Sequence, residues 1–577
     1  MDFRITPLTT LKLCGILLLL LLWGCKKPHE FSEQVTASAE ERIKYGYNPS
    51  IVVATIDESG VSFYPFGKTS EDGKLVDEHT IYEIGSITKT FTAILLAKQV
   101  VEGKVSLDDP INNYLPDSVK VPYIGDQEIT LGHLSDHTSG LPRMPDNFEP
   151  ADPSNPYVDY SVAQLYDFIS HYKPTRSVGS KFEYSNLAQG LLGHILARNE
   201  GMTYEELLIR DITGPLGMTE TKIVLDDHMK EDMALGHDQE AEVSNWDITT
   251  LAGAGGIRSS ASDMAKYISA NLGLIEVDPT LRAAMDLTYE ARHKKAGPNE
   301  FGLAWIITAI GNVYWHNGGT GGYRAYAGFS KKFNKGAVVL TNSTEGVDDI
   351  GQYLLTSESK LREFKPSLTY TLRKKIDDEG LAVASTFFNM INPEGLMDYE
   401  YSEQSLNNLG YHYLMNDKVK IALAVFEMNI ELHPRAFNVY DSYAEALAAV
   451  GQTELAIENY KISLEKNPNN KNAIEKLADL GVVYEVENVS VFEDVLESYV
   501  GRYKLAPRFF IEITREGEHI FGQATNQTRF EMFPIDQTKF YLKVVDAQIE
   551  FMTDEDTGKR SMVLYQNGRE MPGEKVE

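Results

Sequence analysis

The hydrophobic pattern of this chain changes character twice, and these changes constrain its architecture more than any single motif does. Up to about residue 343, strand-like runs alternate with helical spacings. From Ser402 onward the pattern is helical alone, and beyond Val486 it turns to short alternating strands. A chain of 577 residues is long enough for about three or four domains. The pattern therefore predicts a multidomain protein with a large α/β domain, then an all-α domain, then a small all-β domain.

The α/β domain is predicted to close on itself. Residues 50–56 and 61–66 are β-rich and flank a turn at 57–60, which predicts a hairpin. Residues 86–101 carry apolar side chains at helical spacing, and Gly103 follows where a helix cap belongs. Strand-like runs return at 301–307, 312–316, 323–329 and 337–340. We expect these last strands to pair with the first ones in an antiparallel sheet flanked by helices.

An internal repeat marks the helical part. Four positions recur after the same offset of 34 residues: Leu409, Ala422, Phe426 and Pro434 return as Tyr443, Ala456, Tyr460 and Pro468. This period resembles that of tetratricopeptide helix pairs. Residues 368–393 look like a degraded third unit. We expect one tetratricopeptide-like domain over 364–483, which either binds a partner protein or packs on the α/β domain.

The two ends of the chain have different characters. Residues 1–24 read as a signal peptide: a lightly basic start, an apolar run, and then Gly24 before Cys25, an ending that resembles a bacterial lipobox. Cleavage there would leave a lipidated Cys25 anchored to a membrane of the bacterial cell envelope. An uncleaved anchor is the alternative, although roughly ten apolar residues are too few to span a bilayer. The tail at 487–577 resembles a small β domain of unknown function, and residues 25–363 form the large α/β domain.

Charge excludes one class of partner. The formal net charge is −30, with 54 Lys and Arg against 84 Asp and Glu, and no long basic run occurs. Binding to a phosphate backbone requires the opposite sign of charge. Nucleic acid is therefore not an expected partner.

Ser86 and Lys89 are the leading candidates for chemistry. A serine with a lysine three residues later occurs four times, at Ser86, Ser170, Ser357 and Ser463. Only Ser86 stands at the head of a long apolar helix, where free N–H groups favour a developing anion and Lys89 lies on the same face. An ordinary helix cap at Ser86 is the structural alternative.

Two further elements follow in the chain. One is 184–186, Tyr-Ser-Asn, just ahead of another apolar helix; the other is the glycine-rich run 316–322, which starts at His316 between two strands. In order and separation, 86–89, 184–186 and 316–318 resemble the three active-site elements of class C β-lactamases and related D-alanyl-D-alanine peptidases and esterases. The stretches 129–142, 215–218 and 255–260 support the resemblance, which covers roughly 310 residues.

The resemblance implies a role for each residue. Ser86 would attack the substrate carbonyl, Lys89 and Tyr184 would share the proton relay, and Asn186 would orient the substrate. Gly318 belongs to the third element, and the backbone N–H groups of Ser86 and Gly319 would stabilise the oxyanion. Because ordinary pKa values are ~10 for Tyr and ~10.4 for Lys, the residues alone leave open which one is the base.

His316 departs from the pattern, because β-lactamases of this class usually carry lysine there, whereas some peptidases and esterases do not. An imidazole with an ordinary pKa of ~6.5 is largely uncharged at neutral pH. A substrate carboxylate then lacks a fixed cation, unless Arg324 on the next strand reaches in. We therefore expect a carboxypeptidase or esterase rather than an efficient β-lactamase.

The sequence predicts no cofactor, and it leaves one alternative to an enzymatic function. His133 and His137 have the i, i+4 spacing of two zinc ligands, but no Glu follows His133, and we interpret them as a structural loop without a metal. The functional alternative is a non-catalytic envelope protein that binds or senses a partner through its helical repeats.

Overall fold

The structure of the protein is a computed structural model. It describes residues 31–123, 127–238, 241–294, 299–356, 358–391, 393–484, 489–507, 509–525, 527–545, 547–554, 558–566 and 569–576. The predicted signal peptide and Cys25 lie outside these residues. Within them, no helix combines the length and the apolar character that a membrane crossing requires.

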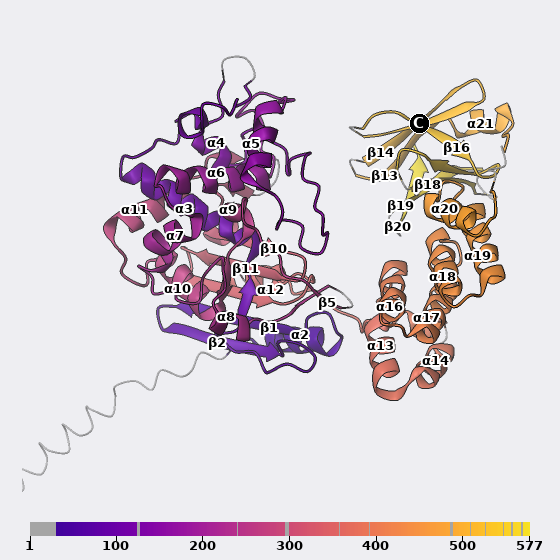
Figure 1. The fold of residues 1–577 in the computed structure, drawn as a ribbon, viewed down its shortest axis with the longest axis horizontal. Helices are drawn as coiled ribbons and strands as arrows, with labels where there is room; N and C mark the ends of the chain where they lie inside the picture. Colours follow the sequence, from indigo (N-terminus) through magenta and orange to yellow (C-terminus); the bar gives the residue numbers. More distant parts are fainter. Residues whose placement is uncertain are drawn as a thin grey trace, which may run out of the picture.

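An eight-stranded antiparallel sheet forms the centre of the first part of the chain (Figure 1). Its strand order is β2-β1-β12-β11-β10-β9-β8-β7. The strands are β1 Ser50–Asp57, β2 Gly60–Gly67, β7 His293–Lys294, β8 Asn299–Phe301, β9 Ile306–Thr308, β10 Val313–Gly319, β11 Arg324–Ser330 and β12 Lys335–Thr341. The predicted hairpin is confirmed, and so is the return of the last strand, because β1 pairs with β12 from Ile51↔Thr341 to Ile56↔Gly336.

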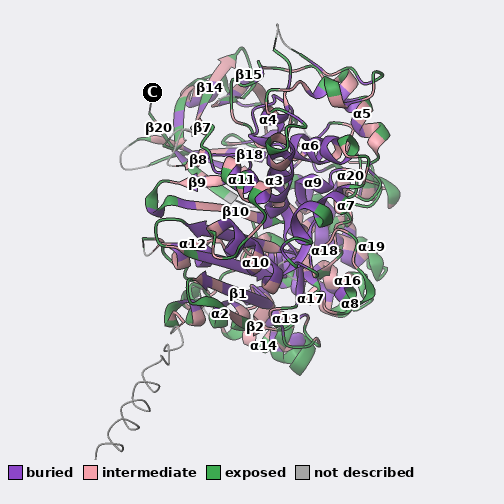
Figure 2. Cartoon of the chain, turned by 90° about the vertical axis from the view of Figure 1, so that its left-hand side faces the viewer, coloured by how far each residue is buried: buried purple, intermediate pink, exposed green. Residues whose placement is uncertain are grey.

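Helices cover both faces of this sheet, as the alternation along β1 requires. Val52 and Ala54 point into the larger apolar core, whereas Ile51 and Val53 point into a second core that contains Val35. The buried strands form the interior in Figure 2. The helices of this domain are α2 Glu33–Lys44, α3 Thr88–Val101, α4 Leu131–Ser135, α5 Val162–His171, α6 Asn186–Asn199, α7 Tyr204–Leu208, α8 Asp227–Glu231, α9 Ala252–Gly255, α10 Ala261–Leu272, α11 Pro279–Thr288 and α12 Asp348–Leu355. A predicted antiparallel sheet flanked by helices is therefore confirmed.

Two local predictions need correction. The run 301–307 was expected to be one strand, but Ala304 has φ of +64° and the chain turns there, so that β8 and β9 form a hairpin. The strand expected at 312–316 was predicted to end at His316, whereas β10 continues to Gly319. An apolar run shows burial but not where a strand reverses, which explains the first error.

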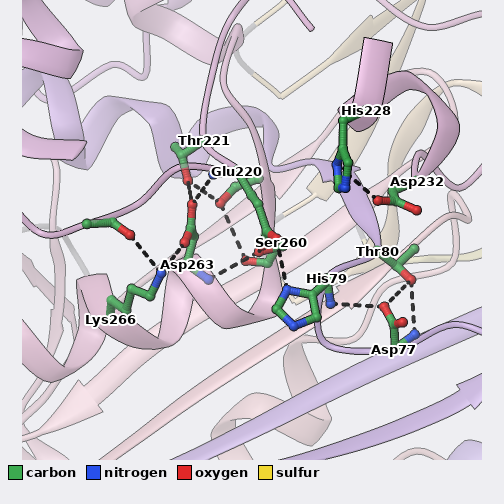
Figure 3. A network of polar contacts seen from close by, with 12 residues as sticks. Asp77, His79, Thr80, Glu220, Thr221, His228, Asp232, Ser260, Asp263 and Lys266 are labelled. Atoms are coloured by element: carbon green, nitrogen blue, oxygen red, sulfur yellow. Dashed lines mark hydrogen bonds and ion pairs between the residues drawn. The ribbon is translucent and has the colours of Figure 1, made fainter. Parts of the chain in front are cut away.

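A polar network joins the two stretches 215–218 and 255–260 to α10 (Figure 3). Asp263, fully buried, accepts hydrogen bonds from the Glu220 N–H at 2.7 Å and from the Thr221 hydroxyl at 2.9 Å. The Ser260 hydroxyl donates to Glu220 at 2.6 Å, and Lys266 bonds both Asp263 and the Gly217 carbonyl. Ser260 ends β6 (Arg258–Ser260), which pairs with β3 (Ile81–Glu83), directly before Ser86. The network therefore helps to hold the strand that leads into the predicted nucleophile.

The second part of the chain is helical, as predicted. Its helices are α13 Leu368–Glu379, α14 Leu381–Met390, α15 Pro393–Leu396, α16 Glu403–Met415, α17 Val419–Leu432, α18 Phe437–Ala449, α19 Thr453–Lys466 and α20 Lys471–Asp479. Small residues allow close packing within pairs: a Cβ atom on Gly410 would lie 2.3 Å from the Phe426 ring. The assignment of these helices to tetratricopeptide repeats stays a prediction.

The last part is a closed eight-stranded barrel preceded by α21 Glu493–Tyr499. Its strands are β13 Gly501–Ala506, β14 Phe509–Glu516, β15 His519–Ala524, β16 Phe530–Pro534, β17 Lys539–Leu542, β18 Ala547–Thr553, β19 Arg560–Gln566 and β20 Arg569–Lys575. The all-β prediction is confirmed. The sequence did not predict β13, β16 or β20. In Figure 1, the helical part and the barrel lie to the right of the α/β domain.

Candidate active site

Ser86 lies in a short 3-10 turn, Gly85–Ile87, that runs directly into α3. Lys89 is one turn further along, and its Nζ is 2.9 Å from Ser86 Oγ and 2.6 Å from the Ala254 carbonyl oxygen. The lysine is fully buried. Burial, and next the nearby Arg143 guanidinium, lower the pKa of Lys89 well below its ordinary value. A lowered pKa favours the neutral amine, which can donate to Ala254 and accept the Ser86 proton.

Tyr184 faces the same pair from the segment before α6. Lys89 Nζ lies 4.9 Å from the Tyr184 ring centroid. Burial raises the pKa of Tyr184 to about 12, while a hydrogen bond with Ser86 and the charge of Arg143 act in the opposite direction. The phenol therefore keeps its proton at neutral pH and can donate it.

The glycines of β10 allow the strand to run against the turn that holds Ser86. A Cβ atom on Gly318 would lie 1.9 Å from the Ile84 carbonyl oxygen and 3.2 Å from Ser86 N. Gly85 has φ of +49°, and a Cβ there would lie 2.5 Å from Gly319 N. A side chain at Gly85 or Gly318 would push β10 away from the turn that holds Ser86. The backbone N–H groups of Ser86 and Gly319 can therefore come close only because both positions are glycines.

His316 lies on β10 beside these groups and is buried. Burial first, and then the charge of Lys89, lower the pKa of His316 to about 3, although a hydrogen bond to the Asn317 carbonyl oxygen, at 2.5 Å, opposes them. The imidazole is therefore uncharged at neutral pH, as the sequence predicts. Its ring centroid lies 6.2 Å from that of Tyr184.

These groups surround one cleft with a volume of about 640 Å³. Asn186, at the start of α6, lines it, and its Oδ1 is buried without a hydrogen-bond partner among the described residues. Arg324 also lines the cleft, although its Nη1 is bonded to the Thr320 and Tyr323 carbonyl oxygens. The lining residues are Ser86, Arg143, Met144, Tyr157, Phe182, Tyr184, Asn186, Trp246, Ile248, Ala254, Gly255, Asn299, Phe301, Ile306, His316, Asn317, Gly318, Gly319, Thr320 and Arg324. The structure thus brings together every site residue that the sequence predicted among the described residues.

Sequence reasoning missed Arg143 and the contact that His137 makes. Arg143 follows Pro142 in a loop without periodicity, and its Cζ lies 5.3 Å from the Tyr184 ring centroid. His137 has φ of +62° and is buried; its ring lies 4.5 Å from that of Tyr184, and its Nδ1 accepts the Ser185 N–H at 3.1 Å. His133 instead bonds Thr130 in the cap of α4. The two imidazoles therefore make separate contacts, and His137 supports the loop that carries Tyr184.

The model of the family described as "Beta-lactamase" matches residues 39–357, more than half of the chain. The chain belongs to the beta-lactamase family. The resemblance predicted from the sequence motifs is confirmed, and with it an enzyme of the serine hydrolase type at the level of the family. A second model, a "Domain of unknown function (DUF3471)", matches residues 487–575.

Individual relatives within the beta-lactamase family are distant. A "Beta-lactamase" of Pseudomonas fluorescens is 28% identical over 327 residues, which are 50% of this chain and 87% of that protein. The "D-alanyl-D-alanine-carboxypeptidase/endopeptidase AmpH" of Escherichia coli K12 is 27% identical over 348 residues, 56% of this chain and 89% of that one. A class C beta lactamase structure from Rhodobacter sphaeroides has a TM-score of 0.50 at 26% identity, and the similarity covers 57% of this chain and 99% of that one. This similarity is confined to part of the chain.

Proposed function

We propose that this member of the beta-lactamase family is a serine hydrolase that forms an acyl-enzyme on Ser86 with an ester, an amide or a D-alanyl peptide. The observation that carries the proposal is the 2.9 Å contact between Ser86 Oγ and the buried Nζ of Lys89 at the edge of the cleft. The similarity to a "Beta-lactamase" and to a "D-alanyl-D-alanine-carboxypeptidase/endopeptidase" supports the same chemistry.

The geometry supports a definite order of proton transfers. Neutral Lys89 accepts the Ser86 proton while Oγ attacks the substrate carbonyl carbon, and the resulting oxyanion accepts hydrogen bonds from the backbone N–H groups of Ser86 and Gly319. Tyr184 donates its proton to the leaving group as the carbon–heteroatom bond breaks, and the ammonium of Lys89 restores the phenol. Water then attacks the acyl-enzyme, and the same groups return the proton to Ser86.

Polar groups on the two walls of the cleft orient the substrate. Asn186 Oδ1, a buried acceptor, can take an N–H from a substrate amide. His316, with its pKa lowered to about 3, supplies no positive charge for a carboxylate. Because β-lactamases of this class usually carry a lysine at this position and some peptidases and esterases do not, we favour a carboxypeptidase or an esterase over an efficient β-lactamase.

Turnover of three substrate types tests this function. A penicillin, a short-chain ester and a D-alanyl-D-alanine peptide would be compared with wild-type protein and with Ser86→Ala. We expect measurable hydrolysis of the ester or the peptide, weaker hydrolysis of the penicillin, and none with Ser86→Ala. Turnover that survives in Ser86→Ala would place the chemistry elsewhere.

The remaining sequence predictions are part of the proposal. We propose that Cys25 is lipidated and holds the enzyme at a membrane of the cell envelope, and that the helical repeats are tetratricopeptide-like and available to a partner protein. The lipobox-like ending before Cys25 and the 34-residue recurrence support these assignments. Cys25→Ser should move the protein from the membrane fraction to the soluble fraction of the cell.

A further inference from the structure

The charges that line the cleft are opposite in sign to those of the chain as a whole. The chain carries 84 Asp and Glu against 54 Lys and Arg. Among the described residues that line the cleft there is neither Asp nor Glu, whereas Arg143 and Arg324 are both present. A cationic cleft in an acidic protein attracts anions to one place, because the surrounding surface repels them.

The guanidinium groups of the two arginines differ in the contacts that they already make within the protein. Arg324, at the start of β11, uses Nη1 to donate to the Thr320 and Tyr323 carbonyl oxygens at 2.9 and 2.8 Å, which fixes it against the turn after β10. Arg143 is exposed, and no described carboxylate lies within ion-pair distance of it. Of the two, Arg143 has the guanidinium that is available to a ligand.

The backbone of Arg143 is nevertheless well fixed. Its carbonyl oxygen accepts the N–H groups of Asn186 and Leu187 at 3.0 and 3.2 Å, so that the residue is attached to the start of α6. Its guanidinium carbon lies 5.3 Å from the Tyr184 ring centroid. The cation therefore stands on the same wall as Tyr184 and as the unpartnered Oδ1 of Asn186.

We propose that Arg143 forms an anion-binding subsite on the Tyr184 wall of the cleft and holds a carboxylate of the substrate. A planar guanidinium matches a carboxylate with two parallel hydrogen bonds, which a neutral side chain cannot do. The subsite is formed by the loop before α6 and not by β10, which carries His316 at the position where β-lactamases of this class usually have a lysine. This inference rests on the proposed function, because it concerns substrates that Ser86 turns over.

Two matched pairs of esters test the subsite. Mono-4-nitrophenyl adipate and its methyl ester differ only by a carboxylate in the acyl half, whereas 3-acetoxybenzoate and its methyl ester differ by one in the leaving half. The measured quantity is the ratio of kcat/KM for the acid to that for its methyl ester. Because Arg143 also lowers the pKa of Lys89, rates on any ester can change in a variant, and the ratio isolates the effect of the carboxylate.

We expect the wild-type ratio to be about tenfold higher than that of Arg143→Gln in at least one pair, and Arg143→Lys to keep part of the difference. The responding pair identifies the half of the substrate that reaches Arg143. Arg198→Gln, which removes one exposed cation at the far end of α6, should keep the wild-type ratio. Arg324→Gln should lower the ratio less than Arg143→Gln does.

Two results would overturn the subsite: equal ratios in wild type and Arg143→Gln for both pairs, or a loss of preference in Arg324→Gln alone. These results leave the proposed function intact, provided that the wild type hydrolyses the methyl esters through Ser86. Failure of the proposed function would be recognised differently, by the absence of Ser86-dependent turnover on all four esters, on the penicillin and on the D-alanyl-D-alanine peptide.

Discussion

Burial acts in opposite directions on the two groups that could take the proton of Ser86. It lowers the pKa of Lys89 well below 10.5, because an ammonium loses its hydration, and it raises the pKa of Tyr184 to about 12, because a phenolate would lose it too. The two shifts favour the neutral amine of Lys89 and the neutral phenol of Tyr184. This combination favours Lys89 as the base and Tyr184 as a proton donor.

The pH dependence of kcat/KM on a neutral ester should report this assignment. Lys89 must be unprotonated to act, so the rate should rise with pH through its lowered pKa and then stay level up to about pH 10.5. His316, with a pKa of about 3, should add no further change above pH 4. If Tyr184 were the base, the rate would keep rising tenfold per pH unit toward pH 10.5, and stopped-flow or spectrophotometric rates would show it.

Single residues also show how far the sequence could predict the site. Ser86, Lys89 and Tyr184 were predicted because each stands at a helix start within an ordered set of motifs. Arg143 was not, since it lies in a loop where no periodicity indicates which way a side chain points. The direction of the pKa shifts was beyond prediction as well, because it depends on burial by segments distant in the sequence.

At the scale of elements, the site depends on how closely β10 runs past the turn at Ser86. Gly318→Ala should lower kcat/KM by about a hundredfold or more, because its Cβ would fall 1.9 Å from the Ile84 carbonyl oxygen and push the strand away from Ser86. Gly346→Ala is the matched control, since its Cβ would meet no atom within 4 Å. Equal activity of both variants would mean that the approach of β10 does not matter.

The network around α10 should contribute stability rather than chemistry. Asp263→Ala leaves the Glu220 N–H and the Thr221 hydroxyl without their acceptor, and we expect it to lower the free energy of unfolding by about 2–4 kcal/mol. Asp227→Ala, whose side chain is 99% exposed, should change it by less than about 0.5 kcal/mol. Urea unfolding of both variants measures the difference, and similar midpoints would contradict a structural role for the network.

Strands were predicted well where a turn or a partner is encoded locally, and less well elsewhere. The β1–β2 hairpin follows from the residues at 57–60, whereas the break within 301–307 depends on Ala304 adopting a positive φ, which its side chain does not favour. In the barrel, β16 is only five residues long and ends at a proline, and although four of its residues are apolar only Met532 is buried, so its sequence lacks the alternation that marks a strand.

At the scale of the whole molecule, the chain has separate apolar cores joined by few polar contacts. The large core of the α/β domain, the cores of the helices and the core of the barrel share no residues. The α/β domain meets the helices through contacts such as Arg373–Glu71, and the helices meet the barrel through Gln548 and the Lys466 carbonyl oxygen. Such contacts contribute little compared with a core.

Thermal unfolding should therefore proceed in more than one step. We expect calorimetry to resolve at least two transitions, and we expect a covalent fluorophosphonate on Ser86 to shift only the transition of the α/β domain. A single transition that shifts as a whole would show that the domains unfold as one cooperative unit.

The proposed chemistry requires Ser86 to be the residue that becomes acylated or phosphonylated. Peptide mass spectrometry after incubation with a fluorophosphonate or a penicillin tests it most directly. We expect one stoichiometric adduct on the peptide that contains Ser86 in the wild-type protein, and no adduct in Ser86→Ala. An adduct on another residue, or equal labelling of Ser86→Ala, would contradict it.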